Sequence, residues 1–445
     1  MKYILSALIP VLFIVSILPL SCGPNIKENV YLEKNSPEEE DVTNIVLPAG
    51  KKIIILPFNY QESKKKFTNP DIIKNILFNS LYSFFSLIPK IDLPEKKVLS
   101  DLHRRKVPLE DIISNYQPDQ IIYGNYILTG SKAAPEIQIK MQIWSKISKN
   151  IFSYTFKSPS DEDIFDTIDT ISAQIIKSVL NEEMKLAFLN INNCKIGKHT
   201  FELYINNKLV GIISNDDFSL SLKLLANTDY WIRLKRPEDR LSPYFAPVKL
   251  KQGETSNISF MLTNLIKDGE FEETKDILSY PPYGLYTDTE KNTIGYKWHF
   301  ILDNGFNPSS NPQGRAKIEE EKAHITIKNT GGSFGIGESI QLSYIPVPLK
   351  TGKVYILSFD ARSSGEKTIV PILCQVISRE AALAQGGIRN YTSIRLIRIN
   401  DRLKNYSFAF RMGFPSDKNA RLAFLLGLDS KEVWIDNVKV ETMEE

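Results

Sequence analysis

The side chains that could support catalysis do not fall into a spacing that catalysis requires. The chain has only four histidines, and none forms the His-Glu-x-x-His pattern that places two imidazoles around zinc. There is no Gly-x-Ser-x-Gly nucleophile motif. The glycine-rich residues 331–337 lack the Lys of a phosphate-binding loop and lead into an expected strand. We therefore expect no enzymatic activity. The histidines are His103, His199, His299 and His324.

Cys22 is the residue for which the sequence predicts a chemical role. It follows an apolar run that begins at Tyr3, with Lys2 before that run and the small Ser21 directly before the cysteine. Residues 18–23 resemble the lipobox of a bacterial lipoprotein signal peptide, although Pro19 stands where the family usually has Leu. The resemblance implies that residues 1–22 are a signal peptide and that Cys22 carries the lipid, including palmitate.

Two other interpretations of this segment remain open. The apolar run could be an uncleaved signal-anchor helix, since its length as a helix would approach the thickness of a membrane, although Pro10 and Pro19 interrupt it. It could also be an ordinary secretory signal in which Cys22 is incidental. The lipoprotein interpretation predicts a protein anchored at the cell envelope, periplasmic or surface-exposed, at the outer membrane in preference to the inner.

The bulk composition excludes several classes of protein. Of 445 residues, 42% are hydrophobic and 24% charged, which is ordinary for globular domains. A net charge of +3 gives no reason to expect nucleic acid, and we interpret the basic residues 64–66 and 103–106 as solvated, loop-like sequence. Cys194 and Cys374 fall in different expected domains, so we expect no disulfide between them.

Residues 23–49 are too polar to form a core and predict a disordered tether. A small α/β domain is expected over residues 50–187. It begins with a buried strand at residues 53–58 and ends with an amphipathic helix from Ile164 to Leu180. Between them we expect helices after Asn69 and over residues 109–116, a strand at 120–128, and a hairpin at 137–156 whose first strand alternates.

The order of these elements resembles the N-terminal domain of TolB and related periplasmic lipoproteins. The residues that carry the likeness are the strand at 54–58 and residues 118–124 with Gly130 after them. The resemblance implies a protein-interaction module that contacts envelope proteins.

In residues 188–263 the hydrophobic pattern is no longer helical, and it predicts six short strands in succession. A turn at Asn206 and Asn207 separates two of them, and Gly253 marks another turn. The pattern predicts a small β-sandwich. The layout resembles a PEGA-type domain, although the Pro-Glu-Gly-Ala motif itself is absent.

Residues 264–445 contain about eight further alternating or β-branched runs, which predict a β jelly roll. The opening residues 264–272, the middle residues 355–362 and the closing residues 435–438 resemble the carbohydrate-binding modules of families 4 and 9. The whole chain is thus expected to be multidomain, α/β plus all-β. The resemblance implies binding of a polysaccharide or a peptidoglycan-type glycan.

The same resemblance suggests which residues would bind the sugar. Aromatic planes cover the C–H faces of a sugar, and amide or guanidinium groups bind its hydroxyls. For each residue a structural role is the competing interpretation. For Trp298, early in a strand, a place in the core is favoured over a sugar-binding role, whereas Tyr391 lies in a glycine-containing loop where we expect exposure. The candidates are Trp298, Tyr344, Arg362, Gln375 and Tyr391.

Such modules often hold a structural calcium ion that joins the two ends of the domain. Calcium prefers hard oxygen ligands. Glu270, Glu272 and Asp436 are the residues that match this idea, and the alternative is that they are ordinary turn and edge residues.

Three functions remain after this reasoning, of which a glycan-active enzyme with an unrecognised site is the least favoured. The first is a lipid-anchored, non-catalytic envelope protein that binds a glycan through its last domain. The second is a structural or assembly lipoprotein that uses the same domains for contacts between proteins.

Overall fold

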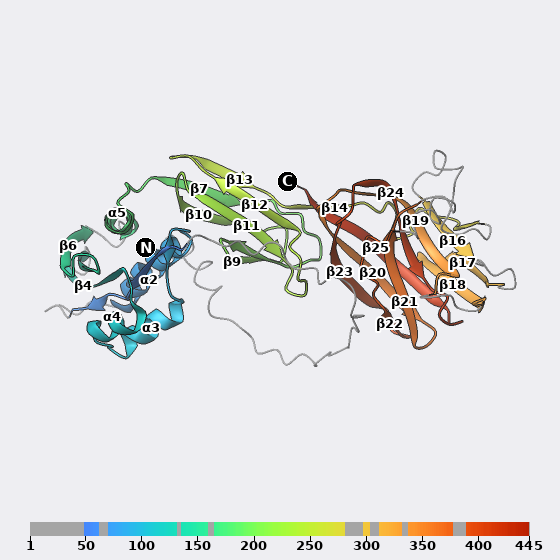
Figure 1. Cartoon of the computed structure of the whole chain (residues 1–445), viewed down its shortest axis with the longest axis horizontal. Coiled ribbons are helices and arrows are strands. Elements are labelled where there is room, and N and C mark those ends of the chain that lie inside the picture. The colour runs from blue at the N-terminus through green and yellow to red at the C-terminus, as the bar shows by residue number, and fades with distance from the viewer. Residues whose placement is uncertain are drawn as a thin grey trace.

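The computed structural model describes residues 49–61, 70–130, 135–158, 164–280, 297–302, 311–331, 337–376 and 389–444. Cys22, the signal peptide, nearly all of the tether and the Asn69 cap lie outside these residues. None of the helices within the described ranges is both long and apolar enough to cross a membrane. The described units follow one another along the long axis of the molecule (Figure 1).

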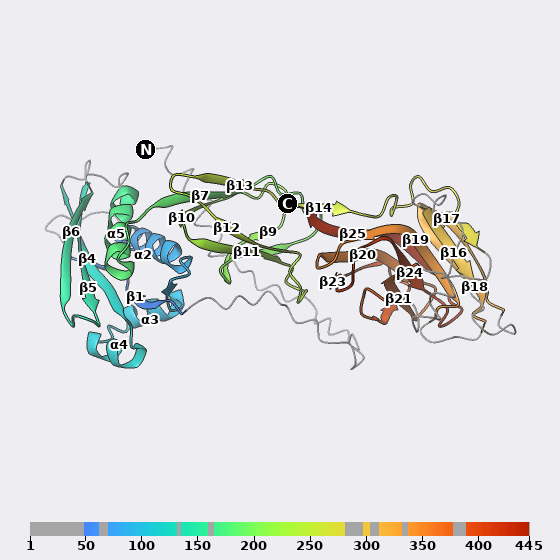
Figure 2. The same ribbon diagram turned by 45° about the horizontal axis from the view of Figure 1, so that its top comes forward.

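The N-terminal unit is a mixed sheet with helices packed on it. Its sheet has the order β3-β1-β4-β5-β6, β2 pairs with β4, and α2 and α5 lie beside one face (Figure 2). The elements are β1 (Lys51–Ile55), β2 (Asn59–Tyr60), α2 (Pro70–Ser86), β3 (Ile91–Asp92), α3 (Lys96–Arg104), α4 (Leu109–Tyr116), β4 (Gln120–Gly130), β5 (Pro135–Ser145), β6 (Ile151–Ser158) and α5 (Ile164–Leu180).

The alternation predicted for the hairpin is confirmed in β5. Ile137, Ile139, Met141 and Ile143 are fully buried, whereas the residues between them are not. One prediction for this unit is wrong: the basic residues 103–106 were expected in a loop, but α3 extends to Arg104. The helix forms because Leu99 and Leu102, three residues apart, bury the same face of an otherwise polar segment.

The middle unit is a small β-sandwich of two sheets, with the orders β10-β7-β13 and β12-β11-β8-β9. The expected turn is confirmed, since Asn206 and Asn207 both have positive φ, at 49° and 64°, as a tight hairpin requires. The strand β7 had not been expected. The elements are β7 (Leu186–Ile191), β8 (Phe201–Ile205), β9 (Lys208–Ile213), β10 (Leu220–Leu225), β11 (Asp229–Lys235), β12 (Tyr244–Lys249) and β13 (Thr255–Ile258).

The C-terminal unit, here called the C-terminal sandwich, consists of two six-stranded sheets around one core. The first sheet has the order β17-β18-β25-β20-β23 with β14 paired to β25, and the second has the order β15-β16-β19-β24-β21-β22. The strands are β14 (Met261–Asn264), β15 (Leu278–Tyr280), β16 (Lys297–Leu302), β17 (Gln313–Glu319), β18 (Lys322–Asn329), β19 (Ile340–Leu349), β20 (Val354–Ser363), β21 (Lys367–Cys374), β22 (Ile397–Ile399), β23 (Lys404–Arg411), β24 (Asp417–Leu425) and β25 (Val433–Glu444).

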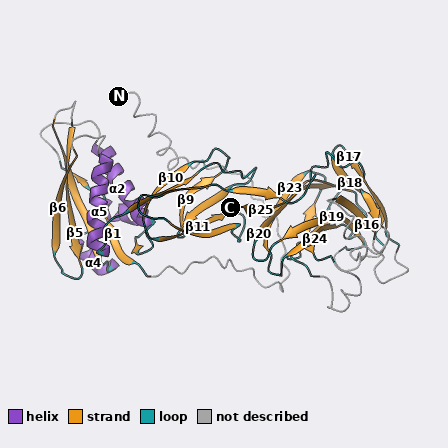
Figure 3. Ribbon diagram, turned by 90° about the horizontal axis from the view of Figure 1, so that it is seen from above, coloured by secondary structure: helices purple, strands orange, loops and turns teal. Residues whose placement is uncertain are grey.

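The described helices all lie at one end of the molecule, whereas sheets occur along its whole length (Figure 3). The strand β14 begins at Met261, so it straddles the expected boundary at residue 264 and joins the middle unit to the first sheet of the sandwich. Cys194 and Cys374 are both buried free thiols, as expected.

Candidate functional site

The structure places Trp298 and Tyr344 in the core of the C-terminal sandwich. Their ring centroids are 5.1 Å apart, and Phe271 packs on Trp298 at 4.7 Å. Only 2% of Trp298 and none of Tyr344 is exposed. The prediction that these rings receive a sugar is wrong, because strand alternation turns both toward the interior between the sheets.

Tyr391 is likewise buried, so the exposure predicted for it is wrong. Its hydroxyl donates a hydrogen bond to Oδ2 of Asp417 at 2.7 Å, which holds the ring against the sandwich. Burial, together with the neighbouring Asp417 carboxylate, raises the pKa of the Tyr391 hydroxyl. Tyr391 therefore acts as a fixed hydrogen-bond donor within the fold.

Arg362 lies on the outer face of the first sheet, together with Asp360 as expected. Its guanidinium lies 4.3 Å from the centre of the Trp434 ring. His324, on the strand at the other side of β25, stacks on Trp434 at 4.3 Å with a 10° angle between the rings. Both faces of Trp434 are therefore covered, so this half-buried aromatic ring offers no plane to a sugar.

The five residues predicted to bind sugar do not form one site. Gln375 follows β21 and is half-buried, and its backbone N–H donates to the carbonyl of Arg389 at 3.0 Å. Arg362 belongs to the first sheet, whereas Trp298 and Tyr344 belong to the second. Trp298 and Tyr344 are in contact, but they meet inside the core.

The three residues predicted to bind calcium do come together. Glu270 and Glu272, after β14, and Asp436, in β25, line one pocket of about 280 Å³. The close approach of the two segments depends on Gly269, because a Cβ there would lie only 1.9 Å from the carbonyl oxygen of Val438. The remaining lining residues are Glu320, Glu321, Lys322 and Asn437.

The surroundings of this acidic pocket disfavour the charged form of the Asp436 carboxyl. Burial raises the pKa of Asp436, and the charges of Asp360 and Glu270 raise it further, although the Asn437 backbone N–H and Lys322 oppose them. Carboxylate oxygens are the ligands that calcium prefers. Within the described residues, however, no three acidic, His or Cys side chains are close enough together to hold a metal ion as they stand. Calcium therefore stays a prediction at this pocket.

The outer face of the second sheet carries polar residues that sequence reasoning missed. His299 of β16 and Ser343 of β19 are register partners, and Gln341 lies two residues before Ser343. Arg421 of β24 lies on the same face, two residues before Ala423, which pairs with Ser343. We call these four residues the polar row. All are nearly or fully buried, and beside them lies an apolar cluster of Val370, Ile372, Cys374, Ala423 and Leu425.

Two oxygen atoms of the polar row have no hydrogen-bond partner among the residues that the structure describes. Gln341 donates through Nε2 to the carbonyl of Glu338 at 2.7 Å, but its Oε1 is buried without a donor. The Oγ of Ser343 is also buried without a partner. Such an atom costs roughly 1–3 kcal/mol, so its presence in a fold calls for an explanation. The alternation of Gln341 and Ser343 between Ile340, Leu342 and Tyr344 is the sequence signal that could have revealed them.

Comparison with known proteins finds similarity among solved structures alone, since no protein-family model and no curated protein matches the chain. A CBM4 carbohydrate-binding module is 19% identical and has a TM-score of 0.31, covering 40% of this chain and 99% of the module. A putative sugar binding protein from Bacteroides thetaiotaomicron is 15% identical with a TM-score of 0.30, covering 40% and 100%. The N-terminal cellulose-binding domain of a β-1,4-glucanase from Cellulomonas fimi is 14% identical with a TM-score of 0.24, covering 37% and 99%.

Proposed function

We propose that this protein is a lipid-anchored, non-catalytic component of the cell envelope that binds a glycan through its C-terminal sandwich. In this proposal the sandwich is a jelly roll, Cys22 carries the anchor, and the TolB-like N-terminal unit contacts envelope proteins. The observation that carries the proposal is the outer face of the second sheet, where buried polar side chains adjoin a buried apolar cluster.

The chemistry of this face matches the chemistry of a sugar. A sugar ring has an apolar C–H face, which Ile372, Ala423 and Leu425 would contact, and a rim of hydroxyls. The unpartnered oxygens of Gln341 and Ser343 accept hydrogen bonds, and a hydroxyl group donates them.

Because Gln341 and Ser343 are fully buried, a glycan reaches them only when this face is uncovered. Binding that waits for such a change has a low association rate. We therefore expect slow association that does not speed up in proportion to glycan concentration.

The experiment is retention of the full chain on immobilised polysaccharides and peptidoglycan fragments, comparing the wild type with Ser343→Ala. The variant removes an oxygen that bonds to nothing in the fold, so weaker glycan binding with intact folding supports the site. Arg362→Gln, on the outer face of the other sheet, is the matched control and should bind as the wild type does. Retention of no glycan, or equal retention of Ser343→Ala, contradicts the proposal.

A second function, in assembly through contacts between proteins, is favoured by the outer face of β8, β9, β11 and β12. Leu209 and Ile212 of β9 are about half exposed there. On the neighbouring strands Trp231 and Phe245 stack with centroids 4.8 Å apart. Leu209→Asp should release envelope proteins cross-linked to the wild type while glycan retention stays unchanged; unchanged cross-links would contradict this alternative.

A further inference from the structure

Each described unit contributes side chains to the core of its neighbour. Leu225 of β10 is buried in the core of the N-terminal unit, and Leu87, which follows α2, is buried in the core of the middle unit. Ile356 of β20 and Met443 of β25 belong to the sandwich but are buried in the core of the middle unit. The joints are therefore packed interiors rather than linkers.

The joint between the N-terminal and middle units is also fixed by polar contacts. The buried Asn206 donates through Nδ2 to the carbonyl of Leu87 at 2.9 Å, and its Oδ1 accepts from the backbone N–H of Trp231 at 2.9 Å. Lys223 forms an ion pair with Asp169 of α5, at 2.7 Å between Nζ and Oδ2.

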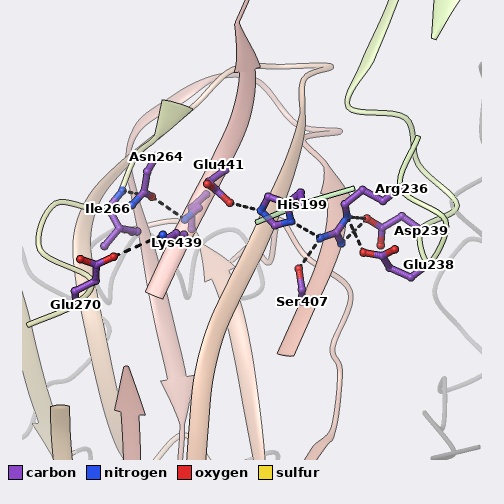
Figure 4. A network of polar contacts seen from close by, with 11 residues as sticks. His199, Arg236, Glu238, Asp239, Asn264, Ile266, Glu270, Ser407, Lys439 and Glu441 are labelled. Carbon is purple, nitrogen blue, oxygen red and sulfur yellow. Dashed lines mark hydrogen bonds and ion pairs between the residues drawn. The ribbon is translucent and has the colours of Figure 1, made fainter. Parts of the chain in front are cut away.

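The joint between the middle unit and the sandwich contains a buried network of charged groups, shown in Figure 4. His199, Arg236 and Asp239 come from the middle unit, and Ser407 and Glu441 come from β23 and β25. We call these five residues the clamp. Arg236 is only 1% exposed and Glu441 only 8%.

The contacts of the clamp run continuously from one unit to the other. Nε2 of His199 lies 2.6 Å from Oε2 of Glu441, and Nδ1 of His199 lies 3.3 Å from Nη1 of Arg236. The same Nη1 donates to Oγ of Ser407 at 2.7 Å, and Nε of Arg236 donates to Oδ2 of Asp239 at 2.5 Å. The other oxygen of Asp239 accepts from the backbone N–H of Ala409 at 3.3 Å.

These partners assign the proton on His199. A guanidinium only donates, so Nδ1 of His199 is the acceptor from Arg236 and carries no proton. Nε2 therefore carries the proton and donates to Glu441. The imidazole links a cation of its own unit to an anion of the next, which fixes the orientation of all three side chains.

The contacts between the middle unit and the sandwich are spread over a wide area and do not lie along a single axis. β14 pairs with β25 along four residues, from Met261 with Glu444 to Asn264 with Glu441, and Met261 also forms a parallel bridge with Lys195 of the middle unit. Leu241 packs on Val354 of β20 and Ala409 of β23. A hinge needs attachments that lie along one line, whereas these extend across three neighbouring strands, β25, β20 and β23.

We propose that the N-terminal unit, the middle unit and the sandwich form one rigid strut, and that the clamp sets the direction in which the sandwich points. The clamp contributes orientation rather than stability, because moving charges out of water costs about as much as their attraction returns. Apolar contacts such as those of Met443 have little directional preference, whereas the charged contacts of the clamp are satisfied at one angle.

The test separates orientation from stability in the full chain. Fluorophores are introduced through non-canonical residues at Asn215 of the middle unit and Lys418 of β24, both of which are exposed. Single-molecule energy transfer then reports the distribution of distances across the joint. The wild type is compared with the double variant Arg236→Met/Asp239→Leu, which replaces the buried ion pair by apolar side chains of similar size.

We expect one narrow distribution for the wild type, and a broader one for the double variant at an equal or higher urea midpoint. A broad distribution in the wild type overturns the strut, and a narrow one in the double variant overturns the role of the clamp. If the double variant does not fold, Glu441→Gln is used in its place, because it removes the negative charge of Glu441 at nearly the same side-chain volume. We expect this variant to broaden the distance distribution. A narrow distribution in Glu441→Gln would also overturn the role of the clamp. Neither readout depends on a glycan, so the proposed function is tested separately.

Discussion

Nε2 of His199 and Oε2 of Glu441 lie 2.6 Å apart although 242 residues separate them in the sequence. The contact joins a loop of the middle unit to the last strand of the sandwich. It completes a continuous series of buried polar contacts that runs from Glu441 through His199 and Arg236 to Asp239 (Figure 4). Such a series can be tested by removing its members one at a time.

Asp239→Asn should destabilise the chain strongly, because the buried Arg236 would keep only the well-exposed Glu238 as a counter-charge. Breaking one half of a buried ion pair costs about 3–5 kcal/mol, which urea unfolding would measure. Glu238→Gln is the matched control: Glu238 also approaches Arg236, at 3.4 Å, but is well exposed. A loss within about 0.5 kcal/mol is expected there. Equal losses in the two variants would contradict the importance of burial.

Ser343→Ala should leave the free energy of unfolding unchanged or raise it by about 1 kcal/mol, because a buried hydroxyl without a partner is removed. Thr392→Val is the contrasting variant, because it removes a buried hydroxyl that does have a hydrogen-bond partner. The Oγ1 of buried Thr392 accepts from the backbone N–H of Leu373 at 3.2 Å, so its loss should cost about 1 kcal/mol. Calorimetric melting of both variants checks the pair. A large loss in Ser343→Ala would indicate that its hydroxyl is bonded within the fold.

Calcium should raise the melting temperature if it binds the acidic pocket. At a calcium concentration of 100 times Kd the gain is about 2.7 kcal/mol. Asp436→Asn and Glu272→Gln, which change lining residues, should lose the gain, whereas Glu366→Gln, exposed and outside the pocket, should keep it. A wild type whose melting does not respond to calcium or chelator would contradict the calcium prediction.

The raised pKa of Asp436 predicts the pH dependence of stability without calcium. A raised carboxyl pKa means that the folded chain holds the proton more tightly than the unfolded chain does. The stability due to Asp436 is therefore greatest below its ordinary pKa of 3.8 and falls as the pH rises through the raised value. Asp436→Asn should accordingly gain stability relative to the wild type between pH 3 and pH 7. A gain that is absent or reversed in urea titrations would mean that the acidic pocket does not penalise this charge.

Cys22→Ala should abolish incorporation of an acyl-chain analogue in growing cells. The thioether and amide acceptors of a lipoprotein anchor belong to this one residue, so no partial labelling is expected. Gel fluorescence of labelled cells provides the measurement, with Cys194→Ala as the control that should still take up label. Label on the Cys22→Ala chain would exclude the lipoprotein interpretation.

Periodicity in the sequence predicted which residues share a face, but not which face is interior. For residues 137–143 the pattern identified both the shared face and the interior face, because the apolar face is the buried one. In β19 both faces are buried: Leu342 and Tyr344 point into the core, and Gln341 and Ser343 are covered on the other side. An aromatic residue such as Trp298 therefore could not be assigned to a surface or a core from alternation alone.

Contacts between segments that are distant in the sequence were the second feature that sequence patterns could not predict. Glu270, Glu272 and Asp436 could be grouped because a family resemblance linked the two ends of the sandwich, and the pocket brings them together. No local pattern linked His199 to Arg236 and Glu441, since each looks like an ordinary surface residue in its own segment.

The pairing of β14 with the end of β25 also sets an order of events during synthesis. Met261 leaves the ribosome long before Glu444, its partner in the ladder, and Met443 fills part of the middle unit's interior. The interior of the middle unit is therefore completed only after β25 has been translated. A chain truncated before Glu441 would keep three nearly complete units, but β14 and the interior of the middle unit would lack their partners in β25, which would leave that joint open to proteases.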